Sequence, residues 1–432
     1  MNKVVEKKHL LAFVLVTCCF ALWGFANDIT NPMVKAFSKI FRMSVTDGAI
    51  VQLAFYGGYI CMALPAALFV RKFSYKAGLL MGLGLYAVGA LMFIPAKATG
   101  NYYPFLIAYF VLTCGLSFLE TTANPYILSL GSKDTATRRL NLAQAFNPIG
   151  SLAGMFVAMQ FIQAKLNPLS TEERALLNED QFNAIKTADL NVLSRPYVII
   201  GAVLVAFFIV ILLFVKTQSK IEEESQDRKF GSTVKRLWNN KPYRFGVVAQ
   251  FFYVGVQIMC WTFIIQYGTR VFMNEGMTEQ AAEVLSQRFN IVAMAIFCVS
   301  RFICTFLLKY IHPSKLLTWL GAVGALLVLA VIFVDGRVGM YCLVAVSACM
   351  SLMFPTIYGI ALTDTGDDAK IGAAGLIMAI LGGSVLPPLQ ARIIDGSGLM
   401  GIASVNLSFV LPLLCFIVIV IYGCFITKTQ KS

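Results

Sequence analysis

Residues 20–33 read FALWGFANDITNPM, a polar interruption within the first long apolar run of the chain. The stretch carries Trp23, Asn27, Asp28 and Asn31 and then reaches a proline. Positions 23, 27 and 31 recur every four residues and would form one polar stripe on a helix, with Asp28 at its edge. A carboxylate inside a membrane segment is costly unless it is solvated or neutralised, so it usually marks a solute pathway. The alternative is that Asp28 lies at the outer interface and simply meets water.

The composition is that of a protein embedded in a lipid bilayer. Of the 432 residues, 58% are hydrophobic and only 13% are charged. Apolar runs of about twenty residues, the length of a membrane span, recur along the chain. Hydropathy places about twelve spans: 10–38, 47–70, 76–95, 103–130, 140–164, 195–216, 243–268, 283–309, 315–334, 338–363, 371–393 and 401–427. No cleavage site of small residues follows the basic start, so we expect the first span to remain. The predicted fold class is an all-α polytopic membrane protein.

The net charge of +13 could indicate a nucleic-acid partner, but the distribution of the charge argues against one. If the N-terminus is cytosolic, most of the 35 Lys and Arg residues fall on the inner side of the predicted spans. This excess is the positive-inside bias of membrane proteins. We therefore expect a multi-pass protein of the bacterial inner membrane with both termini in the cytosol. The sequence leaves the oligomeric state open, and we take a monomer as the expectation.

Neither a metal site nor an enzyme is indicated. All 11 cysteines fall within predicted spans without a metal-ligand or CxxC spacing, so they suit packing. The two histidines, His9 and His312, lie at span ends. A membrane enzyme would need a nucleophile with a base, or a metal cluster. We therefore expect no cofactor and no bound metal.

The two halves of the chain resemble copies of each other. AVGAL occurs at 87–91 and again at 322–326, and other short matches follow in the same order. We expect one six-helix half at 1–216, a cytosolic linker at 217–242 and a second six-helix half at 243–432. Two related halves around a central site is a plan of secondary transporters. The acidic stretch 166–194 is expected to form an external helical excursion with a solvated surface.

Polar stripes recur in the spans of the first half. Besides the stripe at Asn27, they comprise Gln52, Tyr56 and Tyr59, then Glu120 and Asn124, then Gln144, Asn147 and Ser151. Among 22 acidic residues, only Asp28 and Glu120 fall well inside predicted spans. Stripes that face one aqueous cavity could hold a polar, uncharged ligand. The alternative is hydrogen bonding between helices, for which Asn and Gln also serve.

The second half offers aromatic residues rather than acids. Tyr253, Gln257 and Trp261 share one helical face, and Tyr358 follows in a later span. Amides and carboxylates suit the hydroxyls of a sugar, and Trp or Tyr suits its apolar ring face. Such aromatic stripes are also common in packing. Arg301, within the eighth predicted span, is assigned a structural or gating role rather than substrate binding.

At the level of motifs, the chain resembles the fucose:proton symporter family of the major facilitator superfamily. The motifs are FALWGFAN, FLETTANPY, RLNLAQAFN, FPTIYGIAL and KIGAAGLIMAILGGSVLPPL, and the similarity covers nearly the whole chain outside 166–194 and 217–240. The resemblance implies the major facilitator fold, with halves related by pseudo-twofold symmetry. It also implies an essential glutamate at Glu120 and sugar-binding amides at Gln144 and Asn147.

The first span departs from this family. The family's second coupling aspartate falls at Asn31, whereas this sequence has its acid at Asp28. Residues three apart share a helix face, so Asp28 could take over that duty. Alternatively, Asn31 only binds sugar and Glu120 carries the proton alone, or the coupling ion is sodium.

The predicted function is uptake of a monosaccharide, L-fucose first, with a proton by alternating access. The alternatives are proton- or sodium-coupled uptake of glucose, galactose, mannose or N-acetylglucosamine, and then metabolite export or a membrane enzyme. We assign proton coupling to Asp28 and Glu120 and gating to Arg301. The predicted sugar-binding residues are Asn27, Asn31, Gln52, Tyr56, Glu120, Asn124, Gln144, Asn147, Tyr253, Gln257, Trp261 and Tyr358.

Overall fold

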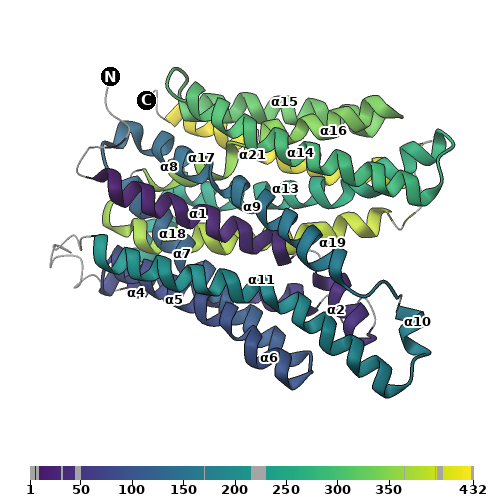
Figure 1. Cartoon of the computed structure of the whole chain (residues 1–432). Helices are drawn as coiled ribbons and strands as arrows, with labels where there is room; N and C mark the ends of the chain where they lie inside the picture. Colours follow the sequence, from purple (N-terminus) through teal and green to yellow (C-terminus); the bar gives the residue numbers. More distant parts are fainter. Residues whose placement is uncertain are drawn as a thin grey trace. The chain divides into compact units, whose positions relative to one another are not determined.

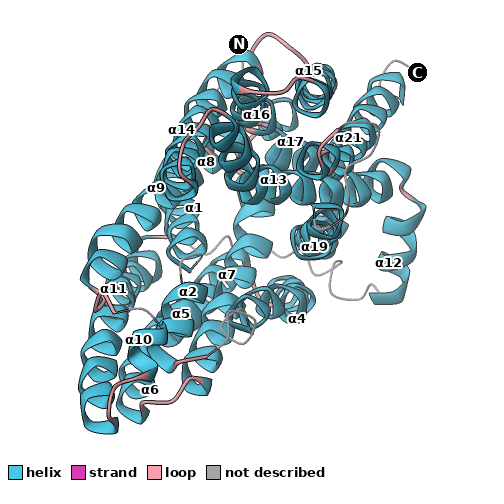
Figure 2. Ribbon diagram, turned by 90° about the vertical axis from the view of Figure 1, so that its right-hand side faces the viewer, coloured by secondary structure: helices cyan, strands magenta, loops and turns pink. Residues whose placement is uncertain are grey.

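The structure is a computed structural model that describes residues 5, 9–30, 33–43, 50–169, 171–215, 230–363, 365–394, 396 and 402–429. These residues form helices joined by short loops (Figure 2). Within the described residues, twelve helical runs are long and apolar enough to cross a bilayer, which confirms the predicted class of polytopic membrane protein. The runs are Leu10–Thr30, Ala54–Lys72, Tyr75–Thr99, Tyr103–Ser129, Lys133–Lys165, Glu179–Phe214, Lys241–Asn274, Val284–Leu307, Pro313–Phe333, Arg337–Leu362, Gly366–Ile394 and Ser404–Thr429.

Internal contacts divide the chain into two compact units. The amino-terminal unit comprises Lys7–Ile127 and Phe146–Arg228, and the carboxy-terminal unit comprises Met1–Glu6, Leu128–Ala145 and Lys229–Ser432. Residues Leu128–Ala145, which the sequence places in the first half, thus cluster with the second. Of the predicted linker 217–242, the part before 230 lies outside the described residues, and α12 (Phe230–Asn239) follows as a helix. The predicted boundaries of the two halves stay a prediction.

The amino-terminal unit is built on long helices that run along one another (Figure 1). Its first spanning helix is α1, which ends at Thr30, and residues 33–38 of the predicted span 10–38 belong to a separate helix, α2. Its elements are α1 (Leu10–Thr30), α2 (Met33–Phe41), α4 (Ile50–Lys72), α5 (Tyr75–Leu91), α6 (Phe93–Thr99), α7 (Tyr103–Ser129), α9 (Asn147–Val157), a π-helical turn (Ala158–Ile162), a short 3₁₀ turn (Gln163–Lys165), α10 (Thr171–Ala175) and α11 (Glu179–Phe214).

Glycine allows α1 and α9 to cross closely, side by side in Figures 1 and 2. A Cβ added at Gly150 would lie 1.8 Å from the backbone oxygen of Ala21. A Cβ added at Gly24 would lie 2.2 Å from the backbone oxygen of Asn147. Only glycine permits this approach at either position. The crossing therefore fixes where α1 and α9 present their polar side chains.

The excursion 166–194 is helical, as expected, but its surface is not uniformly solvated. It forms α10 and the first turns of α11. Arg174 on α10 is fully buried, and its Nη2 lies 2.6 Å from Oδ2 of Asp189, which is 2% exposed. Arg174 also donates hydrogen bonds to the backbone oxygens of Leu169 and Asn167, over 3.2 and 3.0 Å. This buried ion pair, which was not predicted from the sequence, joins α10 to the first turns of α11.

The carboxy-terminal unit packs around α13, whose face carries Tyr253, Val256, Cys260 and Ile264 into one hydrophobic core. Its spans are interrupted where two helices meet end to end, at Ser351–Leu352 and at Ala379–Leu381. Its elements are a 3₁₀ turn (Lys133–Thr135), α8 (Ala136–Gln144), α12 (Phe230–Asn239), α13 (Lys241–Asn274), α14 (Glu279–Leu307), α15 (Pro313–Phe333), α16 (Arg337–Met350), α17 (Met353–Leu362), a 3₁₀ turn (Gly366–Asp368), α18 (Ala369–Met378), a 3₁₀ turn (Ala379–Leu381), α19 (Gly382–Ile394), α20 (Ser404–Leu407) and α21 (Val410–Thr429).

Candidate functional site

A buried polar cluster in the amino-terminal unit joins three helices. The Tyr59 hydroxyl on α4 lies 3.4 Å from Oδ1 of Asn27 on α1 and 3.4 Å from Oε1 of Glu120 on α7. Glu120 is 6% exposed and Tyr59 is 4% exposed. The second carboxyl oxygen of Glu120, Oε2, has no hydrogen-bond partner among the described residues. The structure thus brings two predicted site residues together through a tyrosine that sequence reasoning did not select.

Close packing of α4 on α7 places Tyr59 in this cluster. A Cβ at Gly58 would lie 2.8 Å from Cβ of Thr113 and 2.9 Å from the backbone nitrogen of Cys114. The Ser117 hydroxyl then donates to the backbone oxygen of Tyr59 over 3.3 Å. The signal was present in the sequence, since Tyr59 shares the predicted stripe of Gln52 and Tyr56. Of these, Gln52 lies on α4, but its side chain is outside the description.

One other predicted site residue of α1, Asp28, is described by the structure. Asp28 is half-buried, and its carboxyl group interacts electrostatically with the hydroxyl of Tyr56 on α4. Whether Asp28 takes over the duty of a carboxyl group at position 31 stays a prediction, because Asn31 lies outside the described residues. What the structure does show is that Asp28 lies on the same helix as Asn27 and interacts with Tyr56 on α4.

The predicted amides on α7 and α9 bond to backbone. Nδ2 of Asn124 donates to the backbone oxygen of Glu120 over 2.9 Å, so Asn124 buttresses the helix that carries the carboxyl. Nδ2 of Asn147 donates to the backbone oxygen of Phe20 over 3.2 Å, across the close crossing of α9 on α1. Asn147 is half-buried, whereas Asn124 is fully buried. Of the two, Asn147 is the more exposed residue.

Gln144 and Arg301 meet in the carboxy-terminal unit. Nη1 of Arg301 on α14 donates to the backbone oxygen of Gln144 over 3.0 Å. Its Nε donates to the backbone oxygen of Ser351, and its guanidinium carbon lies 4.6 Å from the centre of the Phe297 ring. Arg301 is 3% exposed, so it does not snorkel to a span end. The contacts join α8, α14 and the end of α16, and the gating role stays a prediction.

The predicted aromatic residues of the carboxy-terminal unit differ in accessibility. Tyr253 is fully buried and donates to the backbone oxygen of Met350 over 3.1 Å. Tyr358 is fully buried and stacks on Phe354, with ring centres 6.2 Å apart. Trp261 is half-buried, and its Nε1 donates to the hydroxyl of Ser347 over 3.2 Å.

Gln257 is also half-buried and lies one turn from Trp261 on α13. An amide and an indole at this spacing share one face of the helix. The pair thus combines a hydrogen-bonding group with a flat, largely apolar ring, and its sugar-binding role stays a prediction.

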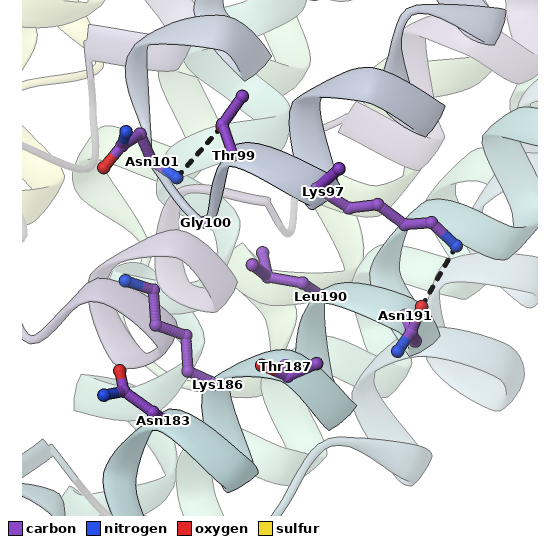
Figure 3. Close-up of a pocket in the computed structure, with 10 residues that line it drawn as sticks. Lys97, Thr99, Gly100, Asn101, Asn183, Lys186, Thr187, Leu190 and Asn191 are labelled. Atoms are coloured by element: carbon purple, nitrogen blue, oxygen red, sulfur yellow. Dashed lines mark hydrogen bonds between the residues drawn. The ribbon is translucent and has the colours of Figure 1, made fainter. Parts of the chain in front are cut away.

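A separate groove lies where α6 ends and α11 begins (Figure 3). It has a volume of about 460 Å³, and Nζ of Lys97 donates to Oδ1 of Asn191 across it over 3.0 Å. Its lining includes a second lysine, Lys186, with Asn101 and Asn183. None of the predicted site residues lines this groove. Among the described residues, no three His, Cys, Asp or Glu side chains gather as metal ligands.

Twelve spans in the described part of the chain, two units and a buried carboxyl within a polar cluster define the class of membrane transporter. The family model for the Major Facilitator Superfamily matches residues 16–387, and the chain belongs to that superfamily. The chain is 52% identical to an L-fucose-proton symporter of Haemophilus influenzae, over 98% of this chain and 97% of the relative. It is 33% identical to an L-fucose-proton symporter of Escherichia coli, over 99% of this chain and 95% of the relative.

A comparison with a solved structure supports the same family assignment. The crystal structure of the Major Facilitator Superfamily transporter FucP in the outward conformation superposes with a TM-score of 0.87 and 32% sequence identity. The match covers 97% of this chain and 99% of that chain. These similarities confirm the predicted family and the fold of twelve spans, and they identify a transporter rather than an enzyme.

Proposed function

We propose that this protein imports L-fucose together with a proton, by alternating access across the bacterial inner membrane. Support comes first from the buried Glu120 carboxyl, which the Tyr59 hydroxyl joins to the amide of Asn27. A proton site and a sugar-binding amide in one cluster are what a sugar–proton symporter needs. The two relatives named above, both L-fucose-proton symporters, support the choice of sugar and ion.

Glu120 is suited to carry the proton. Among the described residues, no Lys, Arg or His bonds to its carboxyl group, and one of its oxygens has no partner. A buried carboxylate without a cation is costly in a low-dielectric interior, whereas protonation removes the charge. The carrier can therefore rearrange with Glu120 protonated and release the proton once the site opens to the cytosol. Asp28 on the same side of the unit is a second proton site in this proposal.

The sugar in turn needs donors, acceptors and an apolar platform. In the proposal, Asn27 and Asn147 are the sugar-binding amides of the amino-terminal unit. Within the carboxy-terminal unit, Gln257 and Trp261 are the proposed sugar-binding groups. Tyr253 and Tyr358 support these groups by packing, because both are fully buried. Arg301 acts at the gate. Both termini face the cytosol, and the protein acts as a monomer because one chain supplies both halves.

The test uses purified protein in liposomes. An imposed inward proton gradient should drive accumulation of labelled L-fucose, and a dye inside the liposomes should report acidification that requires the sugar. Glucose, galactose, mannose and N-acetylglucosamine are compared at the same concentration, and a sodium gradient at constant pH serves as a second arm. Accumulation that follows only the sodium gradient would correct the ion. Saturable uptake of another sugar without L-fucose would correct the substrate.

A further inference from the structure

We propose that Tyr59 is a positioning residue that transmits the protonation state of Glu120 to Asn27 and thereby couples the proton to sugar affinity. This inference rests on the proposed function and concerns how coupling occurs within the amino-terminal unit. It begins from one geometric fact: a single hydroxyl lies 3.4 Å from each of two acceptor oxygens on different helices.

The position of Tyr59 is held by packing on both sides. Gly58, the residue before it, lets α4 approach the backbone of α7. The Ser117 hydroxyl donates a hydrogen bond to the backbone oxygen of Tyr59. The ring of Phe55 meets the Tyr59 ring edge to face, with centres 6.0 Å apart. A buried ring held in this way can turn its hydroxyl hydrogen but cannot move away from Glu120 and Asn27.

The number of available protons decides the hydrogen bonding. A tyrosine hydroxyl carries one hydrogen, an amide oxygen only accepts, and an ionised carboxylate only accepts. With Glu120 ionised, its oxygen and that of Asn27 therefore compete for the same hydrogen. With Glu120 protonated on Oε1, the carboxyl group donates to the Tyr59 oxygen and Tyr59 donates to Asn27. No covalent bond changes apart from the O–H bond that the added proton forms.

The Asn27 amide is held differently when Glu120 is protonated and when it is ionised. In the protonated state, the hydrogen bond from Tyr59 fixes the Asn27 oxygen and so orients its NH₂ group, which lowers the cost of ordering it on binding. In the ionised state, the hydrogen goes to the carboxylate, which is the stronger acceptor, and Asn27 loses its donor. Proton binding thus raises sugar affinity, and by linkage the sugar raises proton affinity by the same factor.

Other titratable groups surround this chain of hydrogen bonds. From α4 itself and from α5, Tyr56 and Tyr86 interact electrostatically with Tyr59. From α1, the carboxyl group of Asp28 interacts with Tyr56. The Tyr86 hydroxyl donates to the backbone oxygen of Leu22 over 3.0 Å, away from Glu120. Tyr86 is therefore the matched control: a buried tyrosine in the same network that bonds to α1 but not to the carboxyl.

The test measures L-fucose affinity of the purified full-length protein across pH. In the unmodified protein, affinity should fall about fivefold or more as pH rises through the titration of Glu120. Tyr59→Phe should bind L-fucose with an affinity that changes less than about twofold over the same range. Tyr86→Phe should keep the full dependence. In infrared spectra, the band of the protonated carboxyl should shift in Tyr59→Phe and not in Tyr86→Phe.

Full pH dependence in Tyr59→Phe would overturn the inference. If Tyr59→Phe does not fold, Asn27→Ala decides, since removing the acceptor should also flatten the pH dependence of the remaining binding. Glu120→Gln distinguishes a failure of the Tyr59 relay from a failure of the proposed function. If the unmodified protein shows pH-dependent binding and Glu120→Gln does not, the proposed function stands and Tyr59→Phe judges the relay alone. A pH-independent affinity in the unmodified protein would contradict proton coupling at Glu120 itself.

Discussion

Arg301 on α14 donates a hydrogen bond from Nη1 to the backbone oxygen of Gln144, the last residue of α8, over 3.0 Å. Since its Nε also bonds to the backbone oxygen of Ser351, one side chain joins three helices of the carboxy-terminal unit. Lysine has a single nitrogen and cannot reproduce this forked contact. The arrangement predicts that Arg301 matters for movement rather than for sugar binding.

For Arg301→Lys, we expect the rate of L-fucose uptake to fall about tenfold, because a buried hydrogen bond from a charged group contributes about 1.5–3 kcal/mol. Equilibrium binding of L-fucose should stay within about twofold, because among the described residues the hydrogen bonds of this side chain go to protein backbone. Arg288→Lys, an exposed position on the same helix, is the control. Uptake by Arg301→Lys at the unmodified rate would rule out the gating role.

The buried pair of Arg174 and Asp189 should determine the stability of the excursion. Removing one partner leaves an uncompensated buried charge, so Arg174→Met should lower the free energy of unfolding by about 3–5 kcal/mol. The double variant Arg174→Met with Asp189→Leu should recover much of that loss. Thermal unfolding in detergent measures both, with Asp180→Asn on the exposed face as control. A single variant as stable as the unmodified protein would show that the pair contributes nothing.

The crossing of α1 and α9 should not tolerate a side chain at Gly150. A methyl group there would overlap the backbone oxygen of Ala21, so Gly150→Ala should cost about 1–3 kcal/mol and separate the helices. Because Asn147 bonds to α1 at this crossing, sugar affinity should fall as well. Gly231→Ala is the control, since no atom of the described residues lies within 4 Å of its added Cβ. Unchanged unfolding temperature and affinity in Gly150→Ala would contradict this packing.

The aromatic residues of α13 should separate into binding and packing roles. Trp261→Ala should weaken L-fucose binding about tenfold or more, as loss of an aromatic contact surface does. Tyr253→Phe should leave affinity unchanged and lower stability by about 1 kcal/mol, through loss of its bond to Met350. Titrating L-fucose against each purified variant distinguishes the two. Equal effects on affinity at both positions would show that the assignment of roles is wrong.

Much of the fold could be predicted from the sequence because long apolar runs have few alternatives in a bilayer. The positions of Glu120 and Asn27 could be selected for the same reason, since polar groups are conspicuous in such runs. Tyr59 could not be chosen over Tyr56, because that choice depends on how α4 is rotated against α7. The contact of Gly58 with Thr113 sets this rotation, and the two positions are far apart in sequence.

In the excursion 166–194, by contrast, the sequence does not reveal which charged residues are buried. Arg174 and Asp189 lie in a polar stretch where charged residues are ordinarily solvated, and nothing in their spacing distinguishes a buried pair from surface charges. The pair becomes visible only when α10 packs against the first turns of α11. Similarly, helical periodicity could not separate the burial of Tyr253 from the partial exposure of Trp261, because both fit the same stripe on α13.

Glu120→Gln tests most directly whether this carboxyl group couples the proton to the sugar. Glutamine keeps the size of the side chain and its hydrogen-bonding capacity but cannot release a proton. In liposomes with an imposed proton gradient, we predict that the variant fails to accumulate L-fucose yet still exchanges labelled for unlabelled L-fucose across the membrane. Full accumulation of L-fucose by Glu120→Gln, driven by the proton gradient, would contradict the role of Glu120.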